Sequence, residues 1–77
     1  MDKYAQLIEK VEKVVDDFTI HDYTDAEEVF PEGVDVQIIT KKAAQINNIW
    51  FPLSRLAVDP DNELYIPNWL LEKKDLR

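Results

Sequence analysis

Hydrophobic residues near the start of the chain recur every three or four positions, the spacing of one face of an α-helix. Within residues 2–18 these positions fall in an arc of about 120° when each residue turns the helix by about 100°. Charged residues occupy most of the remaining positions. The pattern predicts an amphipathic helix over residues 2–18, with a core-facing side formed by Tyr4, Leu7, Ile8, Val11, Val14, Val15 and Phe18.

Residues 19–33 show no sustained period and are expected to connect this helix to the rest of the chain. The letters TDAE at positions 24–27 match a capping box, which predicts a short helical turn starting at Thr24. Pro31 and Gly33 are expected to end that turn. Two apolar residues are expected to hold the turn against the core, Val29 and Phe30.

From residue 34 onward the spacing changes to the alternation of β-strands. We expect one strand over residues 34–46, a hairpin turn at Asn47-Asn48, and a second strand over residues 49–58. Pro52 has no amide hydrogen, so the second strand should lie at a sheet edge or bulge there.

The last third of the chain begins with Asp59-Pro60-Asp61-Asn62, a strong turn signal. A short strand over residues 64–66 follows, and then a helix from Asn68, a candidate N-cap, to about Lys74. The whole pattern predicts an α+β fold in a single domain, residues 1–77. Its parts are an N-terminal amphipathic helix, a short helical turn, a three-stranded antiparallel sheet and a short C-terminal helix.

Composition narrows the class of protein. A chain of 77 residues buries only about 60–65% of its unfolded surface, so its stability margin is narrow. It has no Cys, and therefore neither a disulfide nor a thiolate metal site. Neither a signal-peptide core nor an apolar run near the roughly 20 residues of a membrane span is visible. These features favour a cytoplasmic protein.

Charge is the most informative property of the sequence. Eight of the sixteen acidic residues lie within residues 16–35, which contain no Lys or Arg, and the net charge is −7. The rest of the chain is close to neutral. A concentrated anionic surface repels nucleic acid and attracts proteins with basic surfaces.

The sequence contains few residues of the types that act as catalytic nucleophiles or bases. It has one Ser and one His, and no nucleophile-elbow motif surrounds Ser54. His21 is expected to be an ordinary loop residue. We therefore predict that the protein is not an enzyme and that it uses no cofactor.

A metal site is not expected either. Asp59, Asp61 and Glu63 alternate as at the start of a calcium-binding loop. Such a loop needs a Gly and a closing Glu at the two positions that are here occupied by Leu64 and Leu70. The expected structure is a plain turn.

Direct binding of nucleic acid is a weaker alternative. Lys41-Lys42 could gather with Lys73-Lys74 and Arg77, and the two Trp residues could stack on single-stranded bases. The acidic composition argues against this function, and solvated strand and helix ends account for the same lysines.

The acidic segment allows two interpretations. It could be a solvated connection that keeps a small protein soluble. It could instead be an ordered array of carboxylates that imitates DNA phosphates and docks in a basic groove, with the apolar residues Phe18, Ile20, Tyr23, Val29 and Phe30 as anchors. The candidate partner-binding residues of this array are Asp16, Asp17, Asp22, Tyr23, Asp25, Glu27, Glu28 and Glu32.

An alternative interface lies in residues 48–55, which are rich in residue types common at binding hot spots: Trp50, Phe51 and Arg55. Strand alternation places Trp50 on the face opposite to Phe51. Trp50 is then either exposed or covered by the C-terminal helix through Trp69, and we favour a core or cluster role for the Trp pair.

The C-terminal half resembles small uncharacterised proteins of bacteriophages and prophages. The resemblance rests on the letters WFPLSR at positions 50–55 and YIPNWLLEKK at positions 65–74. Leu53 and Arg55 depart from the pattern, which has Lys and Gln there. The resemblance implies a phage accessory protein acting in a bacterial cytoplasm. The leading hypothesis is therefore a phage-type inhibitor, similar to anti-CRISPR proteins or DNA mimics. Its partner would be a host protein with a basic nucleic-acid-binding groove. The alternative hypothesis is a structural module that binds through the hairpin strand.

Overall fold

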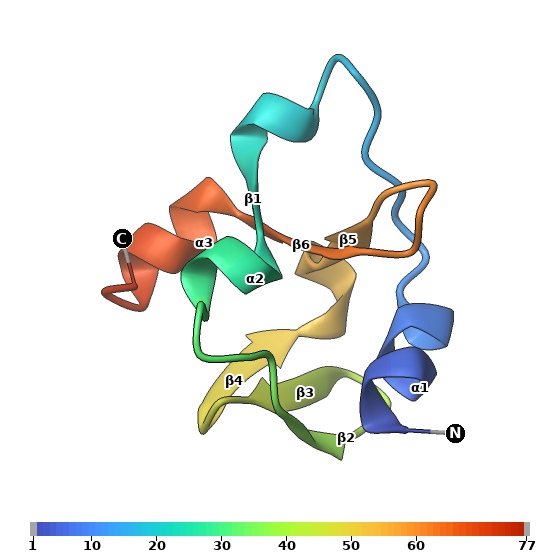
Figure 1. Cartoon of the computed structure of the whole chain (residues 1–77), viewed down its shortest axis with the longest axis vertical. Coiled ribbons are helices and arrows are strands. Elements are labelled where there is room, and N and C mark those ends of the chain that lie inside the picture. The colour runs from blue at the N-terminus through green and yellow to red at the C-terminus, as the bar shows by residue number, and fades with distance from the viewer. Residues whose placement is uncertain (1, 77) are drawn as a thin grey trace.

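The computed structural model describes residues 2–76 and shows two three-stranded antiparallel sheets with three short helices (Figure 1). One sheet has the order β1-β6-β5 and the other β2-β3-β4. The predicted α+β class is confirmed, with two sheets in place of one. In chain order the elements are α1 (Lys3–Lys10), η1 (Ile20–Asp22), β1 (Tyr23–Asp25), α2 (Ala26–Val29), β2 (Val36–Ile39), β3 (Ala43–Ile46), β4 (Ile49–Pro52), η2 (Leu53–Arg55), β5 (Ala57–Val58), β6 (Leu64–Pro67) and α3 (Asn68–Lys73).

Helix α1 is much shorter than the predicted helix over residues 2–18. Asp2 caps its start by accepting a hydrogen bond from the Ala5 amide at 2.8 Å, and Val11 is already extended. Beyond α1 the chain pairs with β5. The Val15 amide donates to the Val58 carbonyl and the Val58 amide to the Lys13 carbonyl, both at 2.9 Å.

Local sequence explains where α1 ends. Val11, Val14 and Val15 are β-branched, and such residues fit a strand better than a helix. Asp16 and Asp17 would place negative charge at the C-terminal end of a longer helix, where the helix dipole disfavours it. The free energy of pairing with β5 then favours the extended conformation.

The N-cap of the short helix lies one residue after the predicted Thr24. Asp25 is the N-cap of α2 and accepts a hydrogen bond from the Glu27 amide at 2.8 Å. Thr24 lies in β1 instead, and its hydroxyl donates to Asn68 Oδ1 at 2.6 Å. Strand β1 was not predicted, because three residues are too few for a visible alternation.

The predicted strand over residues 34–46 is a hairpin. Strands β2 and β3 are separated at Thr40, whose Oγ1 accepts hydrogen bonds from the amides of Lys42 and Ala43. These side-chain bonds compete with ladder hydrogen bonds and turn the chain. The next turn is as predicted, because Asn47 and Asn48 both have positive φ, 49° and 69°, between β3 and β4.

The predicted strand over residues 49–58 is divided between the two sheets. Strand β4 lies at the edge of its sheet and ends at Pro52, as the missing amide hydrogen requires. The one-turn helix η2 then redirects the chain, and β5 pairs with β6 in the other sheet. Pro52 therefore lies at the crossover between the sheets.

The last third follows the prediction closely. The Asn62 amide donates to the Asp59 carbonyl at 3.0 Å and closes the predicted turn before β6. Helix α3 begins at Asn68, but Pro67 occupies the N-cap position. The side chain of Asn68 bridges instead to Thr24 and to the His21 carbonyl.

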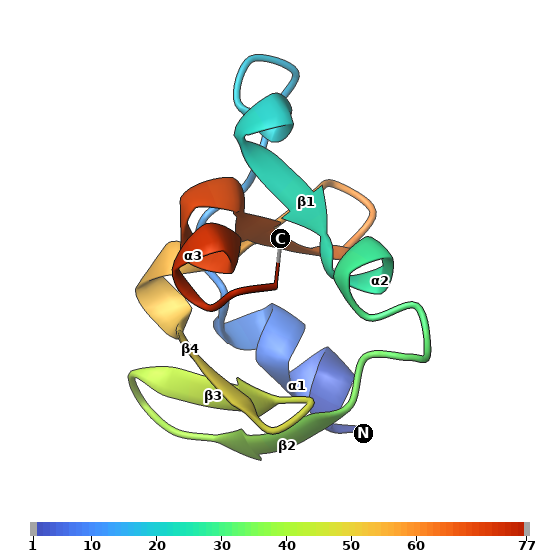
Figure 2. The ribbon, with the colours of Figure 1, turned by 90° about the vertical axis from the view of Figure 1, so that its left-hand side faces the viewer.

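The core fills the space between the two sheets and the three helices (Figure 2). The rings of Phe30 and Phe51 meet edge to face there, with centroids 6.5 Å apart. The predicted anchoring of α2 is confirmed, because Phe30 is buried and Val29 packs against the core. The largest fully buried side chains are Phe51, Leu7, Ile46, Leu56, Leu64, Ile66 and Leu71.

Candidate acidic interaction surface

The acidic residues 16–35 do not form one compact group. The segment runs along the long axis of the molecule, from the loop before η1 to the loop before β2 (Figure 1). The segments that hold Asp16, Asp17 and Asp22 form one end, and Glu32 and Asp35 lie against the β3–β4 turn at the other, where Asn47 binds both. All five are exposed. The fold therefore divides the segment into separate acidic groups.

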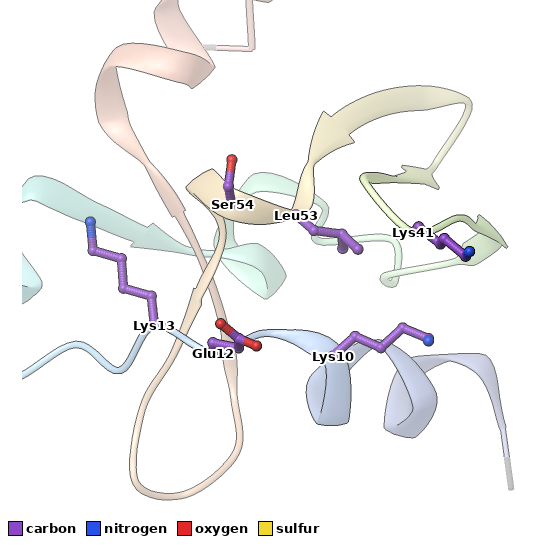
Figure 3. A pocket seen from close by; sticks show the side chains of 6 residues that line it. All are labelled: Lys10, Glu12, Lys13, Lys41, Leu53 and Ser54. Atoms are coloured by element: carbon purple, nitrogen blue, oxygen red, sulfur yellow. The ribbon is translucent and has the colours of Figure 1, made fainter.

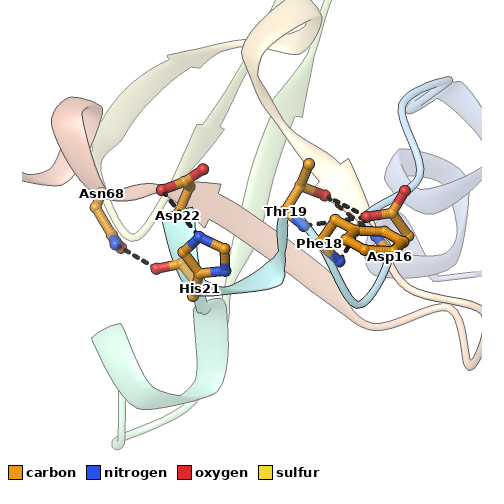
Figure 4. Close-up of polar contacts among 6 residues, drawn as sticks. All are labelled: Asp16, Phe18, Thr19, His21, Asp22 and Asn68. Carbon is orange, nitrogen blue, oxygen red and sulfur yellow. Dashed lines mark hydrogen bonds and ion pairs between the residues drawn. The ribbon is translucent and has the colours of Figure 1, made fainter.

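Asp16 organises the turn in which it lies (Figure 4). Its Oδ1 accepts hydrogen bonds from the amides of Phe18 and Thr19 at 2.9 and 3.0 Å and from the Thr19 hydroxyl at 3.1 Å. The bond from the Phe18 amide is the main cause of a pKa below the ordinary value for Asp16. This carboxylate is charged at neutral pH, but its hydrogen bonds hold the loop.

The carboxylate of Asp22 lies beside the only His of the chain (Figure 4). His21 Nε2 is 3.8 Å from Asp22 Oδ1, and both side chains are largely exposed. The His21 carbonyl accepts a hydrogen bond from Asn68 Nδ2 at 3.1 Å, which ties this loop to α3. Among residues 2–76 this is the only ion pair.

A denser acidic group forms around α2 from both halves of the chain. Asp25 lies opposite Tyr65 in the β1–β6 ladder. Glu63 precedes β6, and its carboxyl group shares a hydrogen bond with that of Asp25, which is the main cause of a raised pKa for Glu63. We call the resulting group the five-carboxylate face: Asp25, Glu27, Glu28, Asp59 and Glu63.

The pKa of Tyr65 is also affected by these carboxylates. Its pKa is raised by partial burial and then by the charges of the neighbouring carboxylates. The pKa of Tyr4 is also raised, first by burial, although the Leu64 amide donates a hydrogen bond to its hydroxyl at 3.1 Å. Negative charge near a phenol disfavours the phenolate, so the neighbouring carboxylates add to the effect of burial on both tyrosines.

Sequence reasoning missed Asp59 and Glu63 as members of this face. Asp59 was expected only to make a turn, and it does, since its Oδ1 accepts from the Asp61 and Glu63 amides at 2.9 Å. The pairing of β1 with β6 brings this turn to the acidic segment. A sequence signal existed in the alternation of acids over residues 59–63, but it gives no spatial partner.

The loop over residues 32–35 is held by one residue of the β3–β4 turn. Asn47 Nδ2 donates to the Gly33 carbonyl at 2.9 Å and to Glu32 Oε1 at 3.3 Å. Asn47 also exchanges two hydrogen bonds with the backbone of Asp35, at 2.7 and 2.9 Å. This end of the acidic segment therefore has a defined conformation.

Two of the predicted anchors are wrong. The Phe18 side chain is 85% exposed and that of Ile20 is 38% exposed. Phe18 was expected to pack inward because the helix was expected to continue to residue 18, and Ile20 was expected to anchor the connection that follows. Tyr23 is half-buried, and Lys13 Nζ lies 5.7 Å from the centre of its ring.

One of the three residues of the alternative interface is not accessible. Phe51 is fully buried, so it is not available to a partner. Trp50 is 43% exposed and faces away from the core, in a cross-strand row with Gln45 and the 46% exposed Ile38. Trp69 is 50% exposed, so neither Trp has the expected core role. The guanidinium of Arg55 lies 5.9 Å from the centre of the Trp69 ring.

The remaining candidate sites are separate surface features. Ser54 lies exposed in η2 and His21 in η1. Within residues 2–76, no group of three His or acidic residues is placed to hold a metal ion. No helix in that range combines the length and the apolar character needed to cross a membrane. Arg77 of the proposed basic patch lies outside the described residues.

Comparison of the chain with protein-family models, curated proteins and solved structures gave no match. The candidate surface therefore stands on its own geometry and charge.

Proposed function

We propose that this chain is a non-enzymatic binding protein whose acidic surface docks on a protein with a basic, nucleic-acid-binding groove. The observation that carries the proposal is that the carboxylates have no Lys or Arg partners within the described part of the chain. Within residues 2–76 no carboxylate pairs with a Lys or Arg, although the chain has nine of these bases. Charges that are not neutralised within the molecule are available to a partner.

Order in the acidic surface supports binding over mere solubility. Hydrogen bonds fix the loops at Asp16, Asp25 and Asn47. A surface that is already ordered loses little conformational entropy when it binds. The partner-binding residues of the proposal are Asp16, Asp17, Asp22, Tyr23, Asp25, Glu27, Glu28 and Glu32, now joined by Asp59 and Glu63.

The finer identity of the function rests on the resemblance of residues 50–55 and 65–74 to small phage proteins. On that basis the protein acts in the bacterial cytoplasm as an inhibitor, in the manner of an anti-CRISPR protein or a DNA mimic. Its partner is a host enzyme that handles nucleic acid. Fixed carboxylates would occupy the lysines and arginines that otherwise hold phosphates.

The test must avoid carboxylates that hold the fold. Asp16 and Asp25 accept backbone hydrogen bonds, whereas Glu27 and Glu28 are exposed and form no ion pair within residues 2–76. We therefore choose Glu27→Lys with Glu28→Lys. Glu9→Lys with Glu72→Lys is the control, because these exposed residues lie on α1 and α3 and the charge change is the same.

Tagged proteins would be used to capture partners from bacterial lysate at low salt and at about 0.5 M salt, where screening acts within a few ångströms. We expect a nucleic-acid enzyme to bind the natural chain and the control at low salt only. The E27K/E28K variant should lose it while its circular dichroism is unchanged. Undiminished capture by that folded variant would reject the proposal.

A second candidate function is binding through the β4 strand, which the exposure of Trp50 and Ile38 favours. A partner bound in this way would be retained at high salt, because apolar contacts are not screened. Replacing Trp50 and Arg55 by Ala should abolish that capture, and reversing Glu27 and Glu28 should not.

A further inference from the structure

A groove of about 460 Å³ lies between the end of α1 and η2, and no residue of the five-carboxylate face lines it (Figure 3). Lys10, Glu12 and Lys13 form one wall, and η2 provides the facing wall. Lys41, from the turn between β2 and β3, lies at one end. The ammonium groups of Lys10 and Lys41 both point toward that end. Leu53 and Ser54 complete the lining.

Three lysines and one carboxylate, Glu12, line this groove, so its formal charge is positive. Lys10, Lys13 and Lys41 make no ion pair with any residue in the range 2–76. Lys13 contacts the Tyr23 ring instead. Two ammonium groups at the same end of the groove attract an anion.

We propose that this groove binds the phosphate group of a small nucleoside phosphate, held between Lys10 and Lys41. Lysine is a common ligand of phosphate, to which it offers a compact positive charge. The volume lies within the range of small-molecule sites. Glu12 only accepts hydrogen bonds when ionised, so it suits hydroxyl or amino groups carried by the same ligand. Leu53 offers an apolar contact to a base.

A long polyanion fits this chain less well. The groove belongs to a molecule with a net charge of −7, which repels the many phosphates of a nucleic acid strand that would extend beyond the groove. A single phosphate group meets mainly the lysines. None of the residues that line the groove belongs to the proposed acidic docking surface.

The experiment is a titration of the isotope-labelled chain at low salt, followed by amide chemical shifts in NMR spectra. The probes are adenosine 5′-monophosphate, adenosine, inorganic phosphate and a short single-stranded DNA. We expect saturable shifts with the monophosphate at residues 10–13, 41 and 53–54, and none with adenosine. Inorganic phosphate should bind there about fivefold more weakly, because it lacks the base and sugar contacts.

Matched variants test the lysines. Lys10→Gln with Lys41→Gln should raise the Kd for the monophosphate at least about fivefold, because both ammonium groups are lost. Lys42→Gln with Lys73→Gln removes the same charge from exposed lysines that do not line the groove. We expect this control to leave the Kd within about twofold.

Four results would overturn the assignment. The first is the absence of a saturable shift with the monophosphate up to about 10 mM, a concentration that would detect even weak sites. The second is that K10Q/K41Q binds the monophosphate as tightly as the natural chain does. The third and fourth are that inorganic phosphate binds as tightly as the monophosphate and that the DNA strand binds more tightly than it. The last two would show that the groove does not select a small nucleoside phosphate.

Discussion

At the scale of single residues, Asn47 connects more of the molecule than a hairpin turn requires. It takes the positive φ of its turn and also makes hydrogen bonds to Glu32, Gly33 and Asp35. The turn was predictable because Asn tolerates positive φ. The bonds to the acidic loop were not, because they depend on where the loop lies in space.

Replacing Asn47 separates these two roles. Asn47→Ala should destabilise the fold by about 2–3 kcal/mol, since Ala is disfavoured at positive φ and the side-chain hydrogen bonds are lost. Asn47→Gly loses only the hydrogen bonds and should cost about 1–2 kcal/mol. Chemical denaturation measures both values. Equal losses would mean that backbone conformation contributes nothing.

Glu63 illustrates the opposite situation, in which a residue destabilises the fold at neutral pH. Its pKa in the folded state is raised above the ordinary 4.5 because Asp25 is so close. The folded chain therefore binds more protons than the unfolded chain as pH passes 4.5. Stability attributable to this pair is present at lower pH and falls as pH rises through the raised pKa.

Glu63→Gln should therefore stabilise the protein at pH 7, because a neutral amide keeps a hydrogen bond with Asp25 and removes the repulsion. The advantage should shrink as pH falls through the raised pKa of Glu63 and should be absent below 4.5, where the natural carboxyl group is protonated in both states. Thermal denaturation at several pH values measures the difference. A variant that is less stable than the natural chain at pH 7 would contradict this account of the pair.

At the scale of elements, the helix prediction failed for a reason visible in the spacing of valines. Residues four apart lie on the same side both of a helix and of a strand. Val11 and Val15 are buried, so their pattern fits either structure. Val14 and Phe18 distinguish the two, and both are exposed. Pairing of residues 13–15 with β5 depends on a segment more than forty residues away, which local periodicity cannot show.

A pair of substitutions tests the end of α1. Val15→Ala should destabilise the protein by about 2 kcal/mol, because the side chain is buried. Val14→Ala should change stability by less than about 0.5 kcal/mol, because Val14 is 59% exposed. A helix extending to residue 18 would bury both side chains, and the two changes would then have similar effects in urea unfolding.

Turns were predicted better than strand partners throughout the fold. The turns at Asn47-Asn48 and residues 59–62 follow from local chemistry, as does the edge position of Pro52. The division into two sheets does not, because Pro52 is equally consistent with a bulge inside one strand. The candidate site shows the same limit: its residues 25–28 were predicted, and the two that β6 brings were not.

At the scale of the whole molecule, charge is unbalanced in space. Carboxylates gather on one face without basic partners, while three lysines line a separate groove. Repulsion within the acidic face opposes folding, and no ion pair to a Lys or Arg within residues 2–76 offsets it. The molecule therefore keeps an electrostatic cost that a partner could relieve.

Added salt should raise the melting temperature of this protein. Moving from about 10 mM to about 0.5 M NaCl shortens the screening length from about 30 Å to a few ångströms, which weakens the repulsion. We expect an increase on the order of 5 °C. The E27K/E28K variant should show a smaller increase, because it has less repulsion to screen. Scanning calorimetry measures the melting temperature at each salt concentration. A decrease with added salt would contradict this prediction and would indicate stabilising ion pairs.

The pairing of β1 with β6 also has a consequence for synthesis of the protein. Asp25 and Glu63 come together only through two strands about forty residues apart in the chain. During translation, β1 has no partner until β6 has been made. Closing such a long loop is slow compared with forming a local hairpin. A growing chain that stops before Leu64 therefore carries the acidic segment without the five-carboxylate face. The proposed binding surface is complete only when the last quarter of the protein folds.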